Sequence, residues 1–159
     1  MDADRDNMPI NELRYRAARP DDYDAIVTLL DQYDLPASDC GEHLDNFIVV
    51  EHDDSIVAVG GYEEAGDFGL IRSFAVDERF TGQRIAETIF TRLTSKATQS
   101  GKTHFYLLTT TASQYFTRLG FMVCDRDTVP DVIRATKQFN DLCPASATVM
   151  MRPLDENNR

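Results

Sequence analysis

The sequence predicts an α/β domain whose central sheet has strands of mixed direction, and two patterns predict it. Three apolar, strand-like runs follow one another with only short turn-prone stretches between them, at residues 47–50, 56–62 and 68–76. Runs spaced in this way are typical of an antiparallel meander. The third run then leads into a long helical pattern over 82–99 and a further apolar run at 104–108. A strand, helix and strand in this order form a βαβ unit, so part of the sheet should be parallel.

The chain before the meander should hold one strand and two helices. Residues 13–19 alternate well enough for a first strand, and Pro20-Asp21-Asp22 opens a helix with an aspartate cap and further acid in its first turn. Apolar residues then recur at helical spacing and predict a buried stripe of Ile26, Leu29, Leu30 and Tyr33. Pro36 ends this helix, and residues 37–43 are expected to form a short second one.

The chain after the meander alternates between helices and strands. In the long helix Ile85, Ile89 and Leu93 recur at helical spacing, and Ser100-Gly101 closes it. The remaining elements are expected as a helix at 112–119, a strand at 121–124, a helix at 130–139 and a strand at 147–151. No linker divides the sequence, so we expect one domain over 12–154 with loose tails at 1–11 and 155–159.

Composition and charge exclude several function classes. The net charge of −11 would repel a phosphate backbone, so nucleic-acid binding is not expected. No apolar run approaches the ~18 residues of a membrane span. The polar, acidic start is unlike a signal peptide, so we expect a cytoplasmic protein with no membrane partner. The cysteines and histidines are scattered without metal-ligand spacing, so no metal is expected.

The stretch from Leu70 to Ala86 carries the candidate cofactor site. It joins an apolar strand, a short turn and the start of the long helix. Helix starts present unpaired N–H groups and a positive dipole end, which suit a phosphate group. Arg79 and Arg84 add local positive charge. On these residues alone, a phosphate site and an ordinary strand-to-helix turn are equal alternatives.

This stretch resembles the GNAT N-acetyltransferases. In that family the strand before the turn pairs with the pantetheine arm of acetyl-CoA, and a Q/R-x-x-G-x-G/A turn holds its pyrophosphate. The resemblance implies acetyl-CoA as co-substrate, bound by Phe74, Ala75, Val76, Thr81, Gly82, Gln83, Arg84, Ile85 and Ala86. Of the motif positions only Ala86 fits, because Thr81 replaces Gln or Arg and Arg84 replaces the middle glycine. Arg84 can be accommodated if its φ is negative and its side chain points outward; otherwise it would crowd the pyrophosphate.

A second stretch, from His104 to Phe121, resembles the strand, loop, helix and Gly-Phe turn of the same family. The resemblance covers roughly residues 13–154. It implies a GNAT-like, mainly antiparallel central sheet flanked by helices, with a parallel βαβ wedge for acetyl-CoA. Runs within 107–121 and 139–147 look like the arsenic-resistance-associated N-acetyltransferases, which are similar in turn to the acetyltransferase domain of N-acetylglutamate synthase.

Candidate catalytic residues follow from the chemistry that the resemblance implies, the direct attack of an amine on the thioester. The backbone N–H near Phe74 is the expected donor to the thioester oxygen. Glu63 could accept the amine's proton, directly or through water, or it could belong with Glu64 to a solvated turn. The family's tyrosine acid would fall at Phe116, beside the cofactor. Tyr115 is then the remaining candidate acid, with core packing as its alternative.

Candidate substrate residues are Arg72, Thr109 and Thr110. Arg72 lies mid-strand, where it would either hold a substrate carboxylate or form an internal salt bridge. Thr109 and Thr110 stand at a strand end, where they would either bind a ligand or serve the turn. The resemblance also puts Cys143 and Ser146 near the substrate.

Together these residues predict an N-acetyltransferase that acts on a small amine or amino-acid substrate. Homodimers are common among such proteins, so a homodimer is compatible with the resemblance. The alternative function is a non-catalytic acyl-CoA-binding sensor or regulatory module. Arg84 and the missing tyrosine at position 116 favour that alternative.

Overall fold

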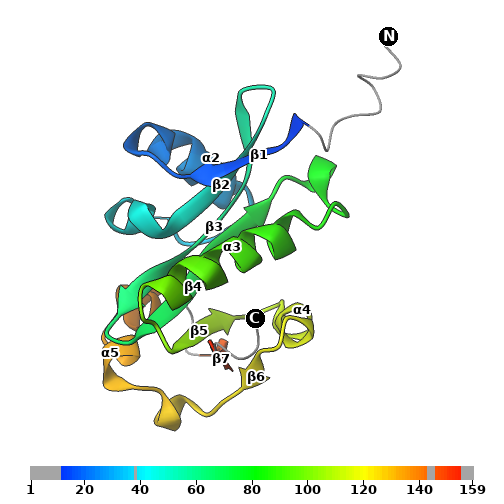
Figure 1. The fold of residues 1–159 in the computed structure, drawn as a ribbon. Helices are drawn as coiled ribbons and strands as arrows, with labels where there is room; N and C mark the ends of the chain where they lie inside the picture. Colours follow the sequence, from blue (N-terminus) through cyan, green and yellow to red (C-terminus); the bar gives the residue numbers. More distant parts are fainter. Residues whose placement is uncertain (1–11, 38, 143–145, 155–159) are drawn as a thin grey trace. The chain divides into compact units, whose positions relative to one another are not determined.

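The computed structural model describes residues 12–37, 39–142 and 146–154 (Figure 1). The expected tails and the candidate substrate residue Cys143 lie outside the described residues. The chain divides into two compact units, one of residues 1–61 and 73–93 and the other of residues 62–72 and 94–159. The expectation of one domain over 12–154 therefore stays a prediction.

Seven strands among the described residues form one sheet, in the order β1-β2-β3-β4-β5-β7-β6. Their bounds are Arg14–Ala17 (β1), Phe47–His52 (β2), Ser55–Ala65 (β3), Phe68–Val76 (β4), His104–Thr109 (β5), Met122–Val123 (β6) and Thr148–Pro153 (β7). β4 and β5 pair parallel, whereas β1 with β2, β2 with β3, β5 with β7 and β6 with β7 pair antiparallel. The prediction of a mixed, mainly antiparallel sheet with one parallel pair is confirmed.

The core of the first unit forms where helix α2 (Tyr23–Gln32) packs on the early strands. The predicted stripe is buried at Ile26, Leu29 and Leu30, which cluster with strand residues such as Phe47 and Val59. The prediction was wrong for Tyr33, which is 37% exposed. Tyr33 follows the last turn of the helix, so its ring leaves the buried face, and its hydroxyl accepts a hydrogen bond from Glu78 N at 2.9 Å.

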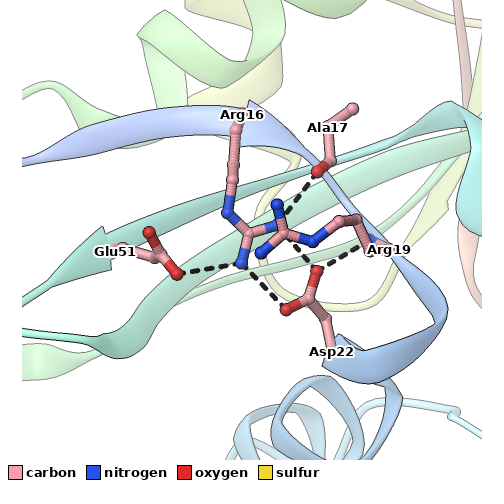
Figure 2. A network of polar contacts seen from close by, with 5 residues as sticks. All are labelled: Arg16, Ala17, Arg19, Asp22 and Glu51. Atoms are coloured by element: carbon pink, nitrogen blue, oxygen red, sulfur yellow. Dashed lines mark hydrogen bonds and ion pairs between the residues drawn. The ribbon is translucent and has the colours of Figure 1, made fainter.

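The aspartate before α2 does not cap the helix as expected. Asp22 stands at the N-cap position but its carboxylate makes no bond to the helix N–H groups. Arg16 instead binds both carboxylate oxygens, at 2.8 and 2.9 Å, and Arg19 N donates to Oδ2 at 2.7 Å (Figure 2). Arg16 also donates to Glu51 Oε2 at 2.9 Å, so the network ties β1, β2 and the start of α2 together.

Two short helices differ from their predicted positions. The helix expected at 37–43 is a 3₁₀ helix at Cys40–Asn46. The helix expected at 130–139 is only α5 (Asp131–Arg134), followed by a π-helical turn at Gln138–Leu142. Thr136 separates these two turns, because its hydroxyl donates to Ile133 O at 2.8 Å and accepts from Phe139 N at 3.2 Å. Side-chain bonds of this kind compete with the helical backbone pattern.

Helix α3 (Ile85–Gln99) carries the long periodic pattern. Ile85, Ile89 and Leu93 are buried as expected. The helix begins later than Gly82 because Gly82 and Arg84 have positive φ angles of +86° and +59°, which an α-helix does not contain.

The second unit is built around β5, which pairs with β4 on one side and β7 on the other. Helix α4 (Ser113–Arg118) ends at Gly120, whose φ of +95° allows Phe121 N to reach Phe116 O at 3.1 Å. The apolar cluster of this unit contains Leu70, Tyr106, Val129, Ile133 and Val149.

Candidate functional site

The segment that follows β4 is held in place by contacts within the first unit. Asp77 N donates to Val57 O at 2.8 Å, and Asp77 Oδ1 accepts from Arg79 N at 2.9 Å to start a 3₁₀ turn at Glu78–Phe80. The Tyr33 hydroxyl accepts a hydrogen bond from the N–H of Glu78. Phe80 is buried, and its ring packs at a tilt of 60° against His52, with ring centroids 5.0 Å apart. These contacts fix the backbone immediately before the candidate phosphate turn.

The candidate turn leaves backbone donors without helical acceptors. The first backbone bond of α3 runs from Thr88 N to Arg84 O at 3.0 Å, so the N–H groups of Ile85, Ala86 and Glu87 precede the hydrogen-bonded turns of the helix. Gly82 has a φ of +86°, and a Cβ built there would meet no atom within 4 Å. The turn therefore combines N–H groups, the positive end of a helix dipole and open space, which together suit an anion.

Arg84 takes a conformation that differs from the expected one. Its side chain points outward, being 84% exposed, but its φ is +59° and not negative. The left-handed region costs a residue with a Cβ roughly 1–2 kcal/mol. Arg84 thus occupies a backbone position of the kind that glycine fills at the middle of the family motif.

The two arginines of the turn differ in how they are paired. Arg79 is held by Asp77 through Nη2–Oδ2 at 2.8 Å and Nε–Oδ1 at 3.1 Å. Hydrogen bonds from Arg79 lower the pKa of Asp77 below its ordinary value. The guanidinium of Arg84 lies 3.6 Å from Glu87 Oε1, longer than a hydrogen bond. The positive charge of Arg79 is therefore balanced by a bonded carboxylate, whereas that of Arg84 is only weakly paired.

The last residues of β4 lead directly into this turn. Ala75 is buried, whereas Phe74 and Val76 are partly exposed. A Cβ at Gly60 would lie 2.9 Å from the ring of Phe74, so the glycine makes room for that ring. Ser73, just before them, has a φ of +63°, which reorients the strand locally. The assignment of the Phe74 N–H as an oxyanion donor stays a prediction.

In the second unit Glu63 and Arg72 form a buried ion pair. Arg72 Nη1 donates to Glu63 Oε1 at 2.9 Å, and the side chains are 0% and 6% exposed respectively. The solvated-turn alternative is wrong for Glu63, because β3 continues to Ala65 and encloses it. Glu64 is solvated as that alternative expects, with a side chain 53% exposed, but it lies in β3 and not in a turn. Of the two alternatives for Arg72, the internal salt bridge is present.

The remaining candidates lie at the end of β5 and after it, in the same unit. Thr109 Oγ1 accepts a hydrogen bond from Ala112 N at 2.9 Å, so this hydroxyl serves the turn, while Thr110 is exposed. Phe116 is buried and packs edge-on against Phe121, with ring centroids 5.7 Å apart. Tyr115 is half-buried on α4. The assignment of Tyr115 as the acid stays a prediction.

Several structural residues around the turn were not predicted. Tyr33 and Asp77 anchor it from positions with no distinguishing sequence motif, and His52 packs behind Phe80. Ligand atoms of Glu12, His52 and Asp53 lie within 4.8 Å of one another, a proximity that the scattered histidines did not predict. Two of these three side chains are well exposed, and exposed acidic groups often gather without a metal.

The fold and the turn together define a mixed α/β protein with a strand–turn–helix whose open N–H groups suit an anion. The chain belongs to the acetyltransferase (GNAT) family, whose family model matches residues 8–121. No helix among the described residues is long and apolar enough to cross a membrane.

Solved structures share this fold over most of the chain. N-acetylglutamate synthase from Neisseria gonorrhoeae, complexed with coenzyme A and N-acetyl-glutamate, is 20% identical with a TM-score of 0.78 over 91% of this chain and 35% of that chain. The same enzyme complexed with coenzyme A and L-arginine is 22% identical, with a TM-score of 0.75 over 91% and 34%. Rv2747 from Mycobacterium tuberculosis, in complex with CoA, is 26% identical with a TM-score of 0.74 over 88% and 98%. The present chain thus spans about a third of the length of the synthase chains.

Proposed function

We propose that this protein transfers an acetyl group from acetyl-CoA to the amine of a small amino-acid-like substrate, by direct attack of the amine within a ternary complex. The observation that carries the proposal is the turn before α3, with its early helix N–H groups and the left-handed Gly82. Membership of the GNAT family supports the acetyl-transfer chemistry.

In this proposal the end of β4 and the following turn bind acetyl-CoA. Residues 74–76 would pair with the pantetheine arm, and residues 81–86 would surround the pyrophosphate. The donor set fits this group, because unpaired N–H groups at a helix start bind phosphate oxygens without a further cation. The space beside Gly82 leaves room for the backbone to approach the phosphate closely.

The substrate side calls for a proton acceptor, and Glu63 is our candidate. An ammonium must lose a proton before it can attack a thioester, and a carboxylate can take that proton through water. Arg72 Nη1 donates to Glu63 Oε1 at 2.9 Å and so holds this carboxylate in a fixed position. Tyr115 would meet the departing thiolate. Thr110 is the exposed hydroxyl available to a substrate carboxylate, because Thr109 and Arg72 already have partners.

The substrate class is proposed from two lines of support. The synthase, of which this chain matches about a third, was solved with N-acetyl-glutamate and with L-arginine, and such ligands in a relative support an amino-acid-like substrate. The likeness to the arsenic-resistance-associated branch adds arsenic-bearing amino-acid analogues to the candidates.

Calorimetry of acetyl-CoA binding, with a matched variant of the turn, tests the cofactor part of the proposal. Gly82→Val should weaken binding at least tenfold, since a β-branched residue at φ +86° strains the turn and occupies its open space. Gly101 also has a positive φ and open surroundings but lies after α3, so Gly101→Val is a control that strains the fold without touching the turn. Equal affinities for the Gly82 and Gly101 variants would refute the placement of the pyrophosphate.

A further inference from the structure

Arg84 combines a strained backbone with an exposed and weakly paired side chain. It holds a left-handed backbone conformation, with a φ of +59°, that is unfavourable for any side chain with a Cβ. Its side chain is 84% exposed and therefore gains little from packing. Among the described residues its ionic neighbour is Glu87, whose Oε1 lies 3.6 Å from Nη1. The carbonyl of Arg84 begins α3 by accepting from Thr88 N, but that bond does not require the arginine side chain, and a strained backbone often marks a functional residue.

The surrounding charges make this cation important for an anionic ligand. The chain carries a net charge of −11, which opposes the approach of any polyanion. Arg79, the other arginine of the turn, is neutralised by two contacts with Asp77 at 2.8 and 3.1 Å. Arg84 therefore supplies positive charge at the turn that is not already committed to a close carboxylate partner.

We propose that Arg84 binds the ribose 3′-phosphate of coenzyme A and makes the protein selective for CoA over 3′-dephospho-CoA. The inference rests on the proposed function, which places the pyrophosphate at the backbone of residues 81–86. The N–H groups of Ile85, Ala86 and Glu87 serve the pyrophosphate at the helix start. The guanidinium extends outward from that backbone, being 84% exposed, and would there meet the terminal phosphate monoester of the same ligand.

The chemistry of the two groups matches. A phosphate monoester carries close to two negative charges and three acceptor oxygens, and a guanidinium can bind two of these oxygens at once through its planar fork. Glu87 competes for the same guanidinium, but its 3.6 Å contact spans one helical turn at an exposed site and is weak. Ligand binding would exchange this contact for a charge-assisted pair of hydrogen bonds.

The test is calorimetric binding of CoA and of 3′-dephospho-CoA to the wild type, Arg84→Gly, Arg84→Gln and Arg84→Lys. The Gly variant relieves the backbone strain and the Gln variant keeps it, so charge and strain are separated. Both uncharged variants should bind CoA about 3- to 5-fold more weakly, the upper size of one exposed ion pair, and bind 3′-dephospho-CoA within about twofold of the wild type. Arg84→Lys should fall between. Arg14→Gln, an exposed arginine of β1, controls for net charge and should change neither affinity.

The outcomes separate this inference from the proposed function. Equal losses for both ligands would put the guanidinium on the pyrophosphate and overturn the 3′-phosphate assignment. Unchanged CoA affinity in both uncharged variants would overturn any ligand role for Arg84 while leaving the cofactor site in place. Failure of the wild type to bind CoA would overturn the proposed function itself. A melting temperature raised by about 2–4 °C in Arg84→Gly would show that the variant is folded and the strain relieved.

Discussion

The buried pair of Glu63 and Arg72 offers a large and measurable perturbation. Replacing Arg72 by Met keeps the length and apolar stem of the side chain but leaves the Glu63 carboxylate, 6% exposed, without its arginine. Breaking a buried ion pair from one side costs about 3–5 kcal/mol. In a protein of this size each kcal/mol lowers the melting temperature by about 2–4 °C, so Arg72→Met should melt roughly 6–20 °C below the wild type.

A double-mutant cycle shows whether the cost comes from the pair. Glu63→Gln and the Glu63→Gln/Arg72→Met double variant are unfolded in urea beside the wild type and Arg72→Met. Because the two side chains are in direct contact at 2.9 Å, the double variant should be at least ~1 kcal/mol more stable than the summed single effects predict. Strict additivity, or a loss under ~1 kcal/mol for Arg72→Met, would refute the view that the two groups form a coupled buried pair.

Two further substitutions test local backbone and charge effects. Asp53 and Asp54 form the two-residue turn between β2 and β3, with φ angles of +51° and +65°, so Asp54→Gly should stabilise the protein by about 1 kcal/mol. Asp31→Gly in α2 should instead destabilise it by roughly 0.3 kcal/mol, since glycine is the poorer helix former. The same sign of change in both melting curves would contradict this reasoning. The hydrogen bonds from Arg16 lower the pKa of Asp22 in the folded protein. The ionised carboxylate therefore stabilises the fold fully above its unfolded pKa of about 4. This stabilisation is lost as the pH falls through the lower pKa of the folded state. Asp22→Asn should therefore lose about 1.5–3 kcal/mol at pH 7 and show a shallower loss of stability below about pH 4; identical acid slopes in urea titrations would count against it.

The strands and the long helix could be predicted because their signals are local and repeated. β4 has the predicted bounds, Phe68–Val76, since a turn-prone Gly66-Asp67 precedes a continuous apolar run. The 3₁₀ helix at Cys40–Asn46 was misplaced because its residues are mostly polar and have no apolar repeat to fix its register. α5 was predicted too long because the hydrogen bonds of the Thr136 hydroxyl are invisible to a periodicity argument.

In the candidate site, too, some features were predictable from the sequence and others were not. Its turn was predictable because the residues are contiguous, whereas the contact from Tyr33 to Glu78 joins positions far apart in sequence. The positive φ of Arg84 was missed because backbone sterics favour negative φ for every residue but glycine, and only the fold overrides that preference. Glu63 was expected either as a base or in a solvated turn, because no residue pattern indicates that β3 extends to Ala65.

The most direct test of the account is release of free thiol from acetyl-CoA by the wild-type protein across a panel of amino acids and their arsenic-bearing analogues, with mass spectrometry of the products. The account predicts that at least one panel member causes thiol release above the hydrolysis background and gains a single acetyl group on its amine. Tight acetyl-CoA binding with no acetylated product from any member of the panel would contradict it and favour the acyl-CoA sensor.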